Sequence, residues 1–288
     1  MSDRGTTARG VTGARSRYPP IGDYAFLGDC HTGALVSSSG SVDWLCLPRL
    51  DDGSYFGRLL DRERGGWCAV TATDPAARGS RRYLDGTLVL QTETTVPGGR
   101  VRLTDCLTMR PGGARRPYRQ LLRVVDGLQG TVDLRVEVVP RFDYGQVRPW
   151  IRRAGRAWQA LGGDDGLVVE GDVPLASSGL HDLVADVRVH AGQRLRLSLR
   201  HVRPEVLDGA GARPPVPAEL DRRLEQTVAW WRGWSARAAR PGRDQAALIR
   251  SATVLKALTQ ATTGAIAAAA TTSLPEAPGG SRNWDYRA

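Results

Sequence analysis

The sequence predicts a mainly β protein, an antiparallel β-sandwich followed by a short α-helical segment. Three observations predict it. Apolar and polar residues alternate with a period of two from Tyr18 to about Val202, turn-forming Gly, Pro and Asp residues separate these runs, and the period changes after Pro217. Many short alternating strands joined by regular turns are typical of antiparallel sandwiches. With 288 residues, the chain is long enough to bury one large core or two modest ones.

Two runs show the alternation most clearly. In each run the apolar residues share one face and charged or polar residues take the other, so we expect the apolar face to point inward. The inward residues are Val132, Leu134, Val136 and Val138 in the first run and Leu195, Leu197 and Leu199 in the second. Further strands are predicted at residues 87–96, 101–108 and 119–126. Turns are predicted at Pro97-Gly98-Gly99 and at Asp126-Gly127.

The C-terminal part has helical periodicity. A Gly- and Pro-rich stretch at residues 208–217 predicts the end of the sandwich, and an amphipathic helix follows it. Its apolar stripe is Leu220, Leu224, Val228, Trp231 and Trp234. A second helix, predicted after Pro241-Gly242, has a wide apolar face that we expect other helices to cover. We interpret Trp230, Trp231 and Trp234 as packing residues and not as a ligand platform.

Composition narrows the class of partner. The formal net charge of +10 and the sequence pI of about 10.2 would suit a nucleic-acid-binding protein if the cations were clustered. However, Lys256 is the only lysine, and the arginines are scattered through the expected strands. We interpret them as a solvated surface and expect no nucleic-acid partner.

Neither the cysteines nor the histidines form a ligand motif. The four cysteines lie far apart without a C-x-x-C pair, at Cys30, Cys46, Cys68 and Cys106. We therefore expect reduced, buried thiols, no metal site and no cofactor. Residues 1–17, which we expect to be a disordered tail, contain no apolar core of a secretory signal, and no apolar run is long enough to span a membrane. Together these features predict a cytoplasmic protein without a membrane partner.

The last 26 residues carry the most specific motif. They contain T-G-A-I from Thr263, then a run of alanines, T-T-S-L-P-E at 271–276 and G-G-S-R-N-W-D-Y-R-A at 279–288. This text resembles the start of the catalytic barrel of glycoside hydrolase family 15, the bacterial glucoamylases and the trehalases of similar architecture. The family pattern has Pro where this chain has Ala270, and it continues Y-x-W-x-R-D where this chain ends at Ala288.

The front of the chain shows the same resemblance. Residues 18–30 (Y-P-P-I-G-D-Y-A-F-L-G-D-C), 40–49 (G-S-V-D-W-L-C-L-P-R) and 140–145 (P-R-F-D-Y-G) resemble the trehalase-like N-terminal domain of bacterial family 15 enzymes. Asp43 and Trp44 within this text have the chemistry of a sugar site, because carboxylates bind hydroxyls and indoles stack on sugar rings. With no second aromatic residue at ligand spacing, we favour turn capping and core packing for this pair.

The resemblance implies a division of the chain. It implies a supersandwich-like trehalase N-terminal domain at residues 18–207, a linker with the amphipathic helix at 208–241, and the truncated start of an (α/α)6 glycosidase barrel at 242–288. Family 15 enzymes hydrolyse α-glucosidic bonds with inversion, which uses two carboxyl groups about 6.5–9.5 Å apart. In the family both glutamates lie beyond the segment where this chain stops. We therefore expect no catalytic residue here and a fragment that is inactive alone.

Substrate-binding residues are expected only near the end of the chain. Tyr286 matches the first Tyr of the family's D-Y-x-Y run, which implies aromatic contact with the non-reducing glucose of an α-glucoside such as a maltooligosaccharide or trehalose. Trp284, Asp285 and Arg287 flank it, either as further substrate-binding residues or as loop anchors. Glu276 is expected to act as a helix cap or ion-pair partner. The alternative is a non-catalytic β-sandwich module that binds carbohydrate or pairs with a separate barrel chain.

Overall fold

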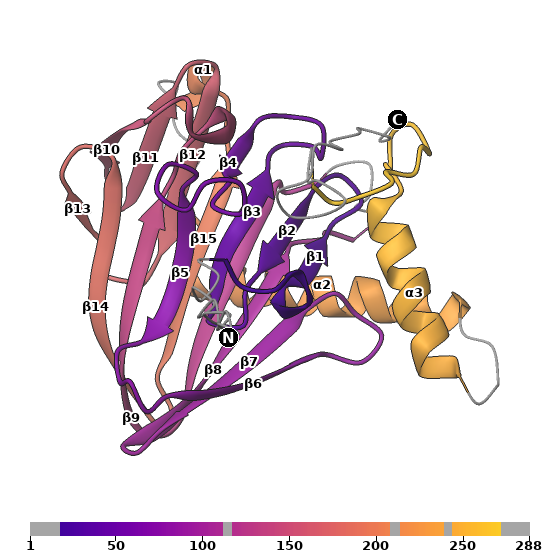
Figure 1. Cartoon of the computed structure of the whole chain (residues 1–288), viewed down its shortest axis with the longest axis horizontal. Coiled ribbons are helices and arrows are strands. Elements are labelled where there is room, and N and C mark those ends of the chain that lie inside the picture. The colour runs from indigo at the N-terminus through magenta and orange to yellow at the C-terminus, as the bar shows by residue number, and fades with distance from the viewer. Residues whose placement is uncertain (1–17, 112–116, 208–213, 239–243, 272–288) are drawn as a thin grey trace, which may run out of the picture.

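Two antiparallel sheets that share one long strand form the body of the protein (Figure 1). The computed structural model describes residues 18–111, 117–207, 214–238 and 244–271. The first sheet contains β1 (Ala25–Gly28), β2 (Gly33–Val36), β3 (Ser41–Cys46), β4 (Ser54–Phe56), β5 (Trp67–Ala72), β13 (Ala176–Ser178) and β14 (Asp182–His190). The second contains β6 (Arg78–Tyr83), β7 (Leu90–Val96), β8 (Gly99–Leu107), β10 (Trp150–Ala154), β11 (Ala157–Gly162), β12 (Asp165–Gly171) and β15 (Arg194–His201). The predicted fold class, a mainly β antiparallel sandwich followed by a helical segment, is confirmed.

The shared strand is β9 (Gln120–Val139), which lies at the centre of both sheets. Its first half pairs with β8 and β15, and its second half pairs with β5 and β14, always antiparallel. The turn predicted at Asp126-Gly127 is wrong, because both residues lie inside β9. A Cβ atom at Gly127 would lie 1.9 Å from the carbonyl oxygen of His190, so glycine here allows close approach of another strand instead of a turn. The turn predicted at residues 97–99 is confirmed between β7 and β8.

The main core lies between the two sheets. The apolar residues of both alternating runs are buried in it, as predicted: Val136 is 1% exposed and Leu197 is 2% exposed. The sequence periodicity fixes these faces because successive strand side chains point to opposite sides.

Charged residues also lie between the sheets. Arg123 on β9 and Asp105 on β8 are fully buried, and the Arg123 Nε atom lies 2.8 Å from Asp105 Oδ1. The same guanidinium donates hydrogen bonds to the carbonyl oxygens of Cys68 (2.6 Å) and Gly40 (2.7 Å), which belong to the opposite layer. The ion pair therefore ties the two sheets together inside the core.

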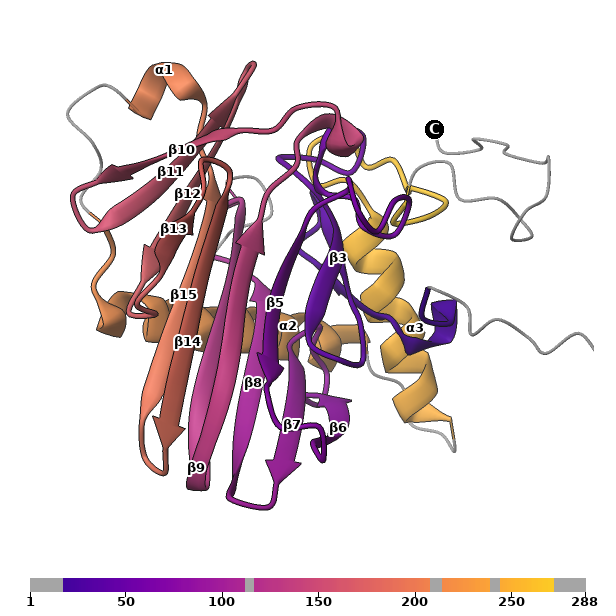
Figure 2. The same ribbon diagram turned by 60° about the vertical axis from the view of Figure 1, so that its left-hand side comes forward.

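Three helices are described after the strands. They are α1 (Pro204–Leu207), α2 (Pro217–Ala238) and α3 (Gln245–Leu258), and two short 3₁₀ turns, η1 (Ile21–Asp23) and η3 (Asp143–Gly145), precede them. α2 lies across the outer face of the second sheet, and α3 runs at a steep angle to it (Figures 1 and 2). Leu220 of α2 packs with Val89, Cys106, Leu122 and Val124 of that sheet. The predicted amphipathic helix is confirmed.

The second predicted helix is only partly covered. Thr253 and Ala257 of α3 are buried against the rest of the protein, whereas Leu248 and Leu255 are 58% and 55% exposed. Trp231 of α2 is fully buried and meets Trp230 edge to face at 4.8 Å, which confirms the packing interpretation for Trp231. Within the described segments, no helix is long and apolar enough to cross a membrane.

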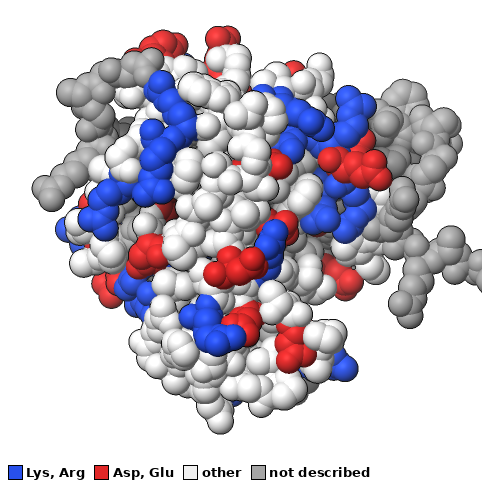
Figure 3. Space-filling view, turned by 90° about the vertical axis from the view of Figure 1, so that its left-hand side faces the viewer, with Lys and Arg blue, Asp and Glu red and all other residues white. Residues whose placement is uncertain are grey.

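The charge on the solvent side of the first sheet is largely paired. Arg188 lies 2.7 Å from Asp133, and Arg135 lies 2.8 Å from Asp186, across β9 and β14. Figure 3 shows acidic and basic side chains intermixed over much of one face, with a longer basic stretch along one edge. Some of the scattered arginines therefore act as cross-strand ion-pair partners.

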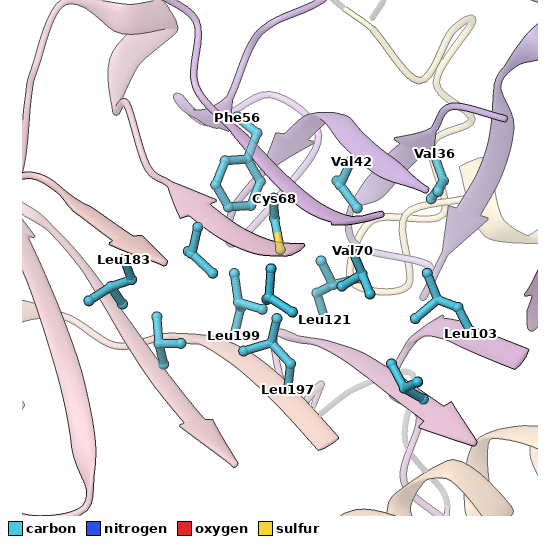
Figure 4. Packing of buried hydrophobic residues seen from close by; sticks show 14 of the residues in the cluster. Val36, Val42, Phe56, Cys68, Val70, Leu103, Leu121, Leu183, Leu197 and Leu199 are labelled. Atoms are coloured by element: carbon cyan, nitrogen blue, oxygen red, sulfur yellow. The ribbon is translucent and has the colours of Figure 1, made fainter. Parts of the chain in front are cut away.

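Figure 4 shows how the two layers meet. Val42, Cys68 and Val70 of the first sheet point toward Leu103, Leu121 and Leu197 of the second. Such interdigitation is the normal packing of a β-sandwich core.

Candidate functional site at the junction of sheet and helices

The junction between the first sheet and the segment after α3 begins with the turn that joins β1 and β2. Asp29 organises this turn, because its Oδ1 atom accepts hydrogen bonds from the backbone N–H groups of His31 (3.0 Å) and Thr32 (2.8 Å). Cys30 has a φ of 67°, in the left-handed region that a non-glycine residue seldom adopts. The turn therefore presents the Cys30 and His31 carbonyl groups in fixed positions.

The segment that follows α3 binds to those carbonyl groups. The backbone N–H of Ala261 donates to the Cys30 oxygen (2.9 Å), and the Gln260 side-chain amide donates to the His31 oxygen (3.2 Å). Ten residues later, the indole N–H of Trp44 donates to the Ala270 carbonyl oxygen (3.0 Å). The first sheet thus holds the chain at both ends of residues 260–270, directly before the segment in which sequence motifs place the substrate-binding residues.

Two buried hydrogen-bond acceptors at this junction have no partner among the described residues. They are Asp29 Oδ2 and Gln260 Oε1. Burial is the main cause that raises the pKa of the Asp29 carboxyl, while the hydrogen bond from the Thr32 backbone opposes it. A carboxyl group in this setting, once protonated, can donate a hydrogen bond, whereas the ionised form needs a donor such as a hydroxyl or amide group.

Asp43 and Trp44 pack within the fold and do not form an open sugar site. Asp43 accepts hydrogen bonds from the hydroxyl groups of Tyr24 (2.8 Å) and Ser41 (2.5 Å), and it is 2% exposed. Trp44 is fully buried, with the Tyr144 ring 6.0 Å away. The packing interpretation is confirmed, and the carbonyl contact of Trp44 adds a role that sequence spacing did not reveal.

The four sequence-predicted substrate-binding residues, Trp284, Asp285, Tyr286 and Arg287, lie outside the described residues, as does Glu276. Their roles stay predictions. The residues missed by sequence reasoning are Asp29, Gln260 and Ala270, for which no local pattern exists because Trp44 and Ala270 are 226 residues apart.

A second buried polar cluster lies between β4 and the end of β15. The Tyr55 hydroxyl donates to Asp165 Oδ1 (2.9 Å) and lies 2.8 Å from His201 Nδ1. Burial, followed by the positive charges of Arg119 and Arg203, lowers the pKa of His201 to about 4. His201 is therefore neutral at pH 7, and the fully buried Tyr55 has no access to a substrate.

The described residues contain no candidate metal site. No group of three or more His, Cys, Asp or Glu side chains is placed to hold a metal ion there. All four cysteines are buried and unbridged, and burial raises the pKa of the Cys30 thiol to about 12. A thiol with so high a pKa is a poor nucleophile.

The fold and the junction define the class of protein: an antiparallel β-sandwich against which the helices α2 and α3 are docked. Residues 9–202, more than half of the 288 residues, match the family model described as "Trehalase-like, N-terminal". The chain belongs to this trehalase-like N-terminal family.

Relatives of known name extend the similarity beyond the sandwich. The chain is 34% identical over 300 aligned residues to a trehalase of Mycolicibacterium smegmatis, which covers 95% of this chain and 43% of that protein. A trehalase of Mycobacterium tuberculosis is also 34% identical, with 95% and 42% covered. A trehalase of Thermoplasma volcanium is 29% identical over 273 residues, with 94% and 42% covered. The chain spans less than half the length of these relatives.

Proposed function

We propose that the chain acts as the N-terminal part of a trehalase-type glycoside hydrolase that cleaves α-glucosidic bonds, with trehalose as substrate. The observation that carries this proposal is the trehalase-like family match, extended by relatives named trehalase along 94–95% of the chain. The terminal motif supports assignment to glycoside hydrolase family 15. The inverting mechanism of that family uses two carboxyl groups, which we expect in the part of the relatives that this chain does not cover.

Within this proposal the sandwich has a positioning role. The turn at Asp29–Thr32 and the Trp44 indole fix residues 260–270, and the segment that follows contains Tyr286. A glucose-binding aromatic residue works only if its loop is held in one place relative to the reacting bond. The hydrogen bonds to residues 260–270 support such a positioning role, because their partners Cys30, His31 and Trp44 belong to the first sheet and its β1–β2 turn.

Fusion to a relative tests the proposed activity. The part of Mycolicibacterium smegmatis trehalase beyond its aligned region would be joined after Arg287, and glucose release from trehalose, maltose and maltooligosaccharides would be measured. We expect trehalose hydrolysis by the fusion and no glucose release by residues 1–288 alone. Hydrolysis by residues 1–288, or a fusion that cleaves only maltooligosaccharides, would contradict the proposal.

Within the active fusion, Tyr286→Ala tests the residue-level assignment. We expect kcat/KM to fall by about 100-fold or more, the size of effect seen when a group that stabilises a transition state is removed. His181→Ala is the control, since His181 is not among the junction residues and its Nδ1 atom lies 2.8 Å from the carbonyl oxygen of Pro149. A Tyr286→Ala fusion with unchanged kinetics would show that the terminal motif has a structural role alone.

A second candidate function is that of a non-catalytic module that pairs with a separate helical chain. The exposed apolar residues Leu248, Leu255 and Ile266, each more than half exposed, favour it, because further helices would bury them. Mixing residues 1–288 with the separately produced remainder of the relative, followed by the trehalose assay, distinguishes a two-chain enzyme from one that requires covalent fusion. The four reduced cysteines support a cytoplasmic location for either form.

A further inference from the structure

A cavity at the free edge of the second sheet has the composition of a ligand site. Its volume is about 290 Å³, close to the lower end of the range for small-molecule sites, which is roughly 300–1,000 Å³. The β10–β11 hairpin forms one wall, and the end of β12 with the residues after it forms the other. All of its lining residues are described, and none belongs to the junction with the helices.

The hairpin wall carries two cations without an acidic partner. Arg153 lies near the end of β10 and Arg156 lies in the turn between β10 and β11, and both residues are exposed. Within the described segments neither arginine takes part in an ion pair, whereas Arg194, Arg196 and Arg200 of β15 in the same sheet all do. The Nε atom of Arg153 donates only to the carbonyl oxygen of Gly155 (3.0 Å), which leaves its terminal nitrogens free. Two adjacent unpaired guanidinium groups favour a multiply charged oxyanion.

The acidic residues of the opposite wall do not neutralise these cations. Asp172 is engaged by Arg196, with the NH1 atom 2.9 Å from Oδ2. Glu170 is engaged by Arg200, with the NH2 atom 3.2 Å from Oε1. Neither carboxylate forms an ion pair with Arg153 or Arg156 in the described structure, so the hairpin side of the cavity keeps its two positive charges, although Glu170 Oε2 has no hydrogen-bond partner there.

The remaining surface of the cavity is apolar and suits the carbon face of a sugar ring. Trp158, Leu175 and Val173 line it, and the Arg153 guanidinium lies 5.0 Å from the centre of the Trp158 ring. This contact holds the cation at the boundary between the apolar wall and the open side. A ligand that fits both walls combines a small body with an apolar face and an anionic end, and a sugar ring that carries a phosphate has this form.

We propose that this cavity binds a phosphorylated hexose, with the phosphate on Arg153 and Arg156 and the sugar ring against Trp158. The site uses only the sandwich, so it does not depend on the proposed catalytic function. It gives the N-terminal domain a ligand of its own, chemically related to the sugars on which the trehalase relatives act.

Isothermal titration calorimetry of the full chain with glucose 6-phosphate, glucose and inorganic phosphate tests the site. We expect glucose 6-phosphate to bind at least about tenfold more tightly than either of the other two, because only it uses both walls. Equal binding of inorganic phosphate would refute the sugar contact, and equal binding of glucose would refute the anion contact. No binding of glucose 6-phosphate would overturn the proposal.

Matched variants locate the binding. Arg153→Gln and Arg156→Gln should each weaken glucose 6-phosphate binding by at least about tenfold, and Arg100→Gln should change it less than about twofold. Arg100 is an equally exposed arginine in the β7–β8 hairpin, outside the cavity. Equal weakening by all three variants would indicate a diffuse charge effect and overturn the site. Because the substituted side chains are exposed, unchanged thermal unfolding should accompany each variant, and the wild-type titration decides the outcome independently of them.

Discussion

Replacement of Arg123 by methionine should be among the most damaging single changes in the sandwich. The guanidinium is fully buried, pairs with the fully buried Asp105, and donates to the Cys68 and Gly40 carbonyl oxygens of the other sheet. Methionine has a similar length but no donor. Arg123→Met therefore leaves the buried Asp105 carboxylate without its partner and removes a side-chain donor from two carbonyl groups, of which that of Gly40 keeps the Val70 N–H (3.2 Å).

The expected loss follows from these contacts. Removal of one partner from a buried ion pair costs about 3–5 kcal/mol, and the lost hydrogen bond to the Cys68 carbonyl adds about 1–3 kcal/mol. Since domains are stable by only about 5–15 kcal/mol, we expect Arg123→Met to lose a large fraction of the free energy of unfolding. Urea unfolding followed by tryptophan fluorescence, with linear extrapolation to water, measures this free energy.

A double variant separates charge from shape. Arg123→Met combined with Asp105→Leu removes the orphaned carboxylate, so it should regain about 2 kcal/mol or more relative to the single variant. The matched control is Arg188→Met, whose pair with Asp133 is exposed (65% and 51%) and should cost less than about 1 kcal/mol. The reasoning fails if Arg123→Met is as stable as Arg188→Met, or if the double variant is no more stable than the single one.

Further changes probe the junction and the second polar cluster. Gly28→Ala would bring a Cβ atom to 2.6 Å from the Ala257 side chain, so it should lower the free energy of unfolding in urea by about 1–3 kcal/mol. Gly233→Ala, in the open part of α2, is the control and should raise the free energy of unfolding by up to about 1 kcal/mol. Equal effects of the two variants would refute the close packing of α3 on β1. His201 is neutral in the folded protein down to about pH 4 but gains a proton near pH 6.5 when unfolded, so stability present above pH 6.5 is lost as the pH falls toward 4. We expect about 2–3 kcal/mol of this loss to be absent in His201→Gln, and identical pH profiles would contradict the assignment. Trp44→Phe removes only the indole donor, so it should cost about 1 kcal/mol and speed amide exchange in residues 260–270; unchanged exchange there would show that the contact does not hold the segment.

The strands and helices could be predicted where the information is local. Leu195, Leu197 and Leu199 repeat every second residue, and this spacing alone places them on the buried face. The continuity of β9 could not be predicted in this way. The Asp126-Gly127 pair is typical of turns. Only the close approach of the His190 carbonyl group, from a strand distant in sequence, explains why a glycine lies inside β9.

The candidate site at the junction could be predicted from the sequence to a smaller extent than the strands and helices. Sequence motifs point to Tyr286 and its neighbours, which stay predictions, and they indicate nothing about what holds that segment. Trp44 and Ala270 meet across 226 residues, and Asp29 acts through backbone groups of its own turn. Such contacts depend on the tertiary arrangement of strands and helices, which no periodicity in the chain encodes. The uncovered side of α3, with Leu248 and Leu255, likewise could not be distinguished from its buried side, because both are apolar.

The sharing of β9 between the two sheets has a consequence for how the sandwich opens. One backbone supplies hydrogen bonds to β8 and β15 in one layer and to β5 and β14 in the other, so the loss of β9 removes a neighbour from four strands at once. Neither layer can melt while the other stays closed, and the slowest-exchanging amide protons of both should report a single opening event. Its strand partners are also distant in sequence, residues 67–72 on one side and 182–190 on the other, so assembly waits for long loops to close. We therefore expect the sandwich to fold slowly and as one cooperative unit, despite being built from two sheets.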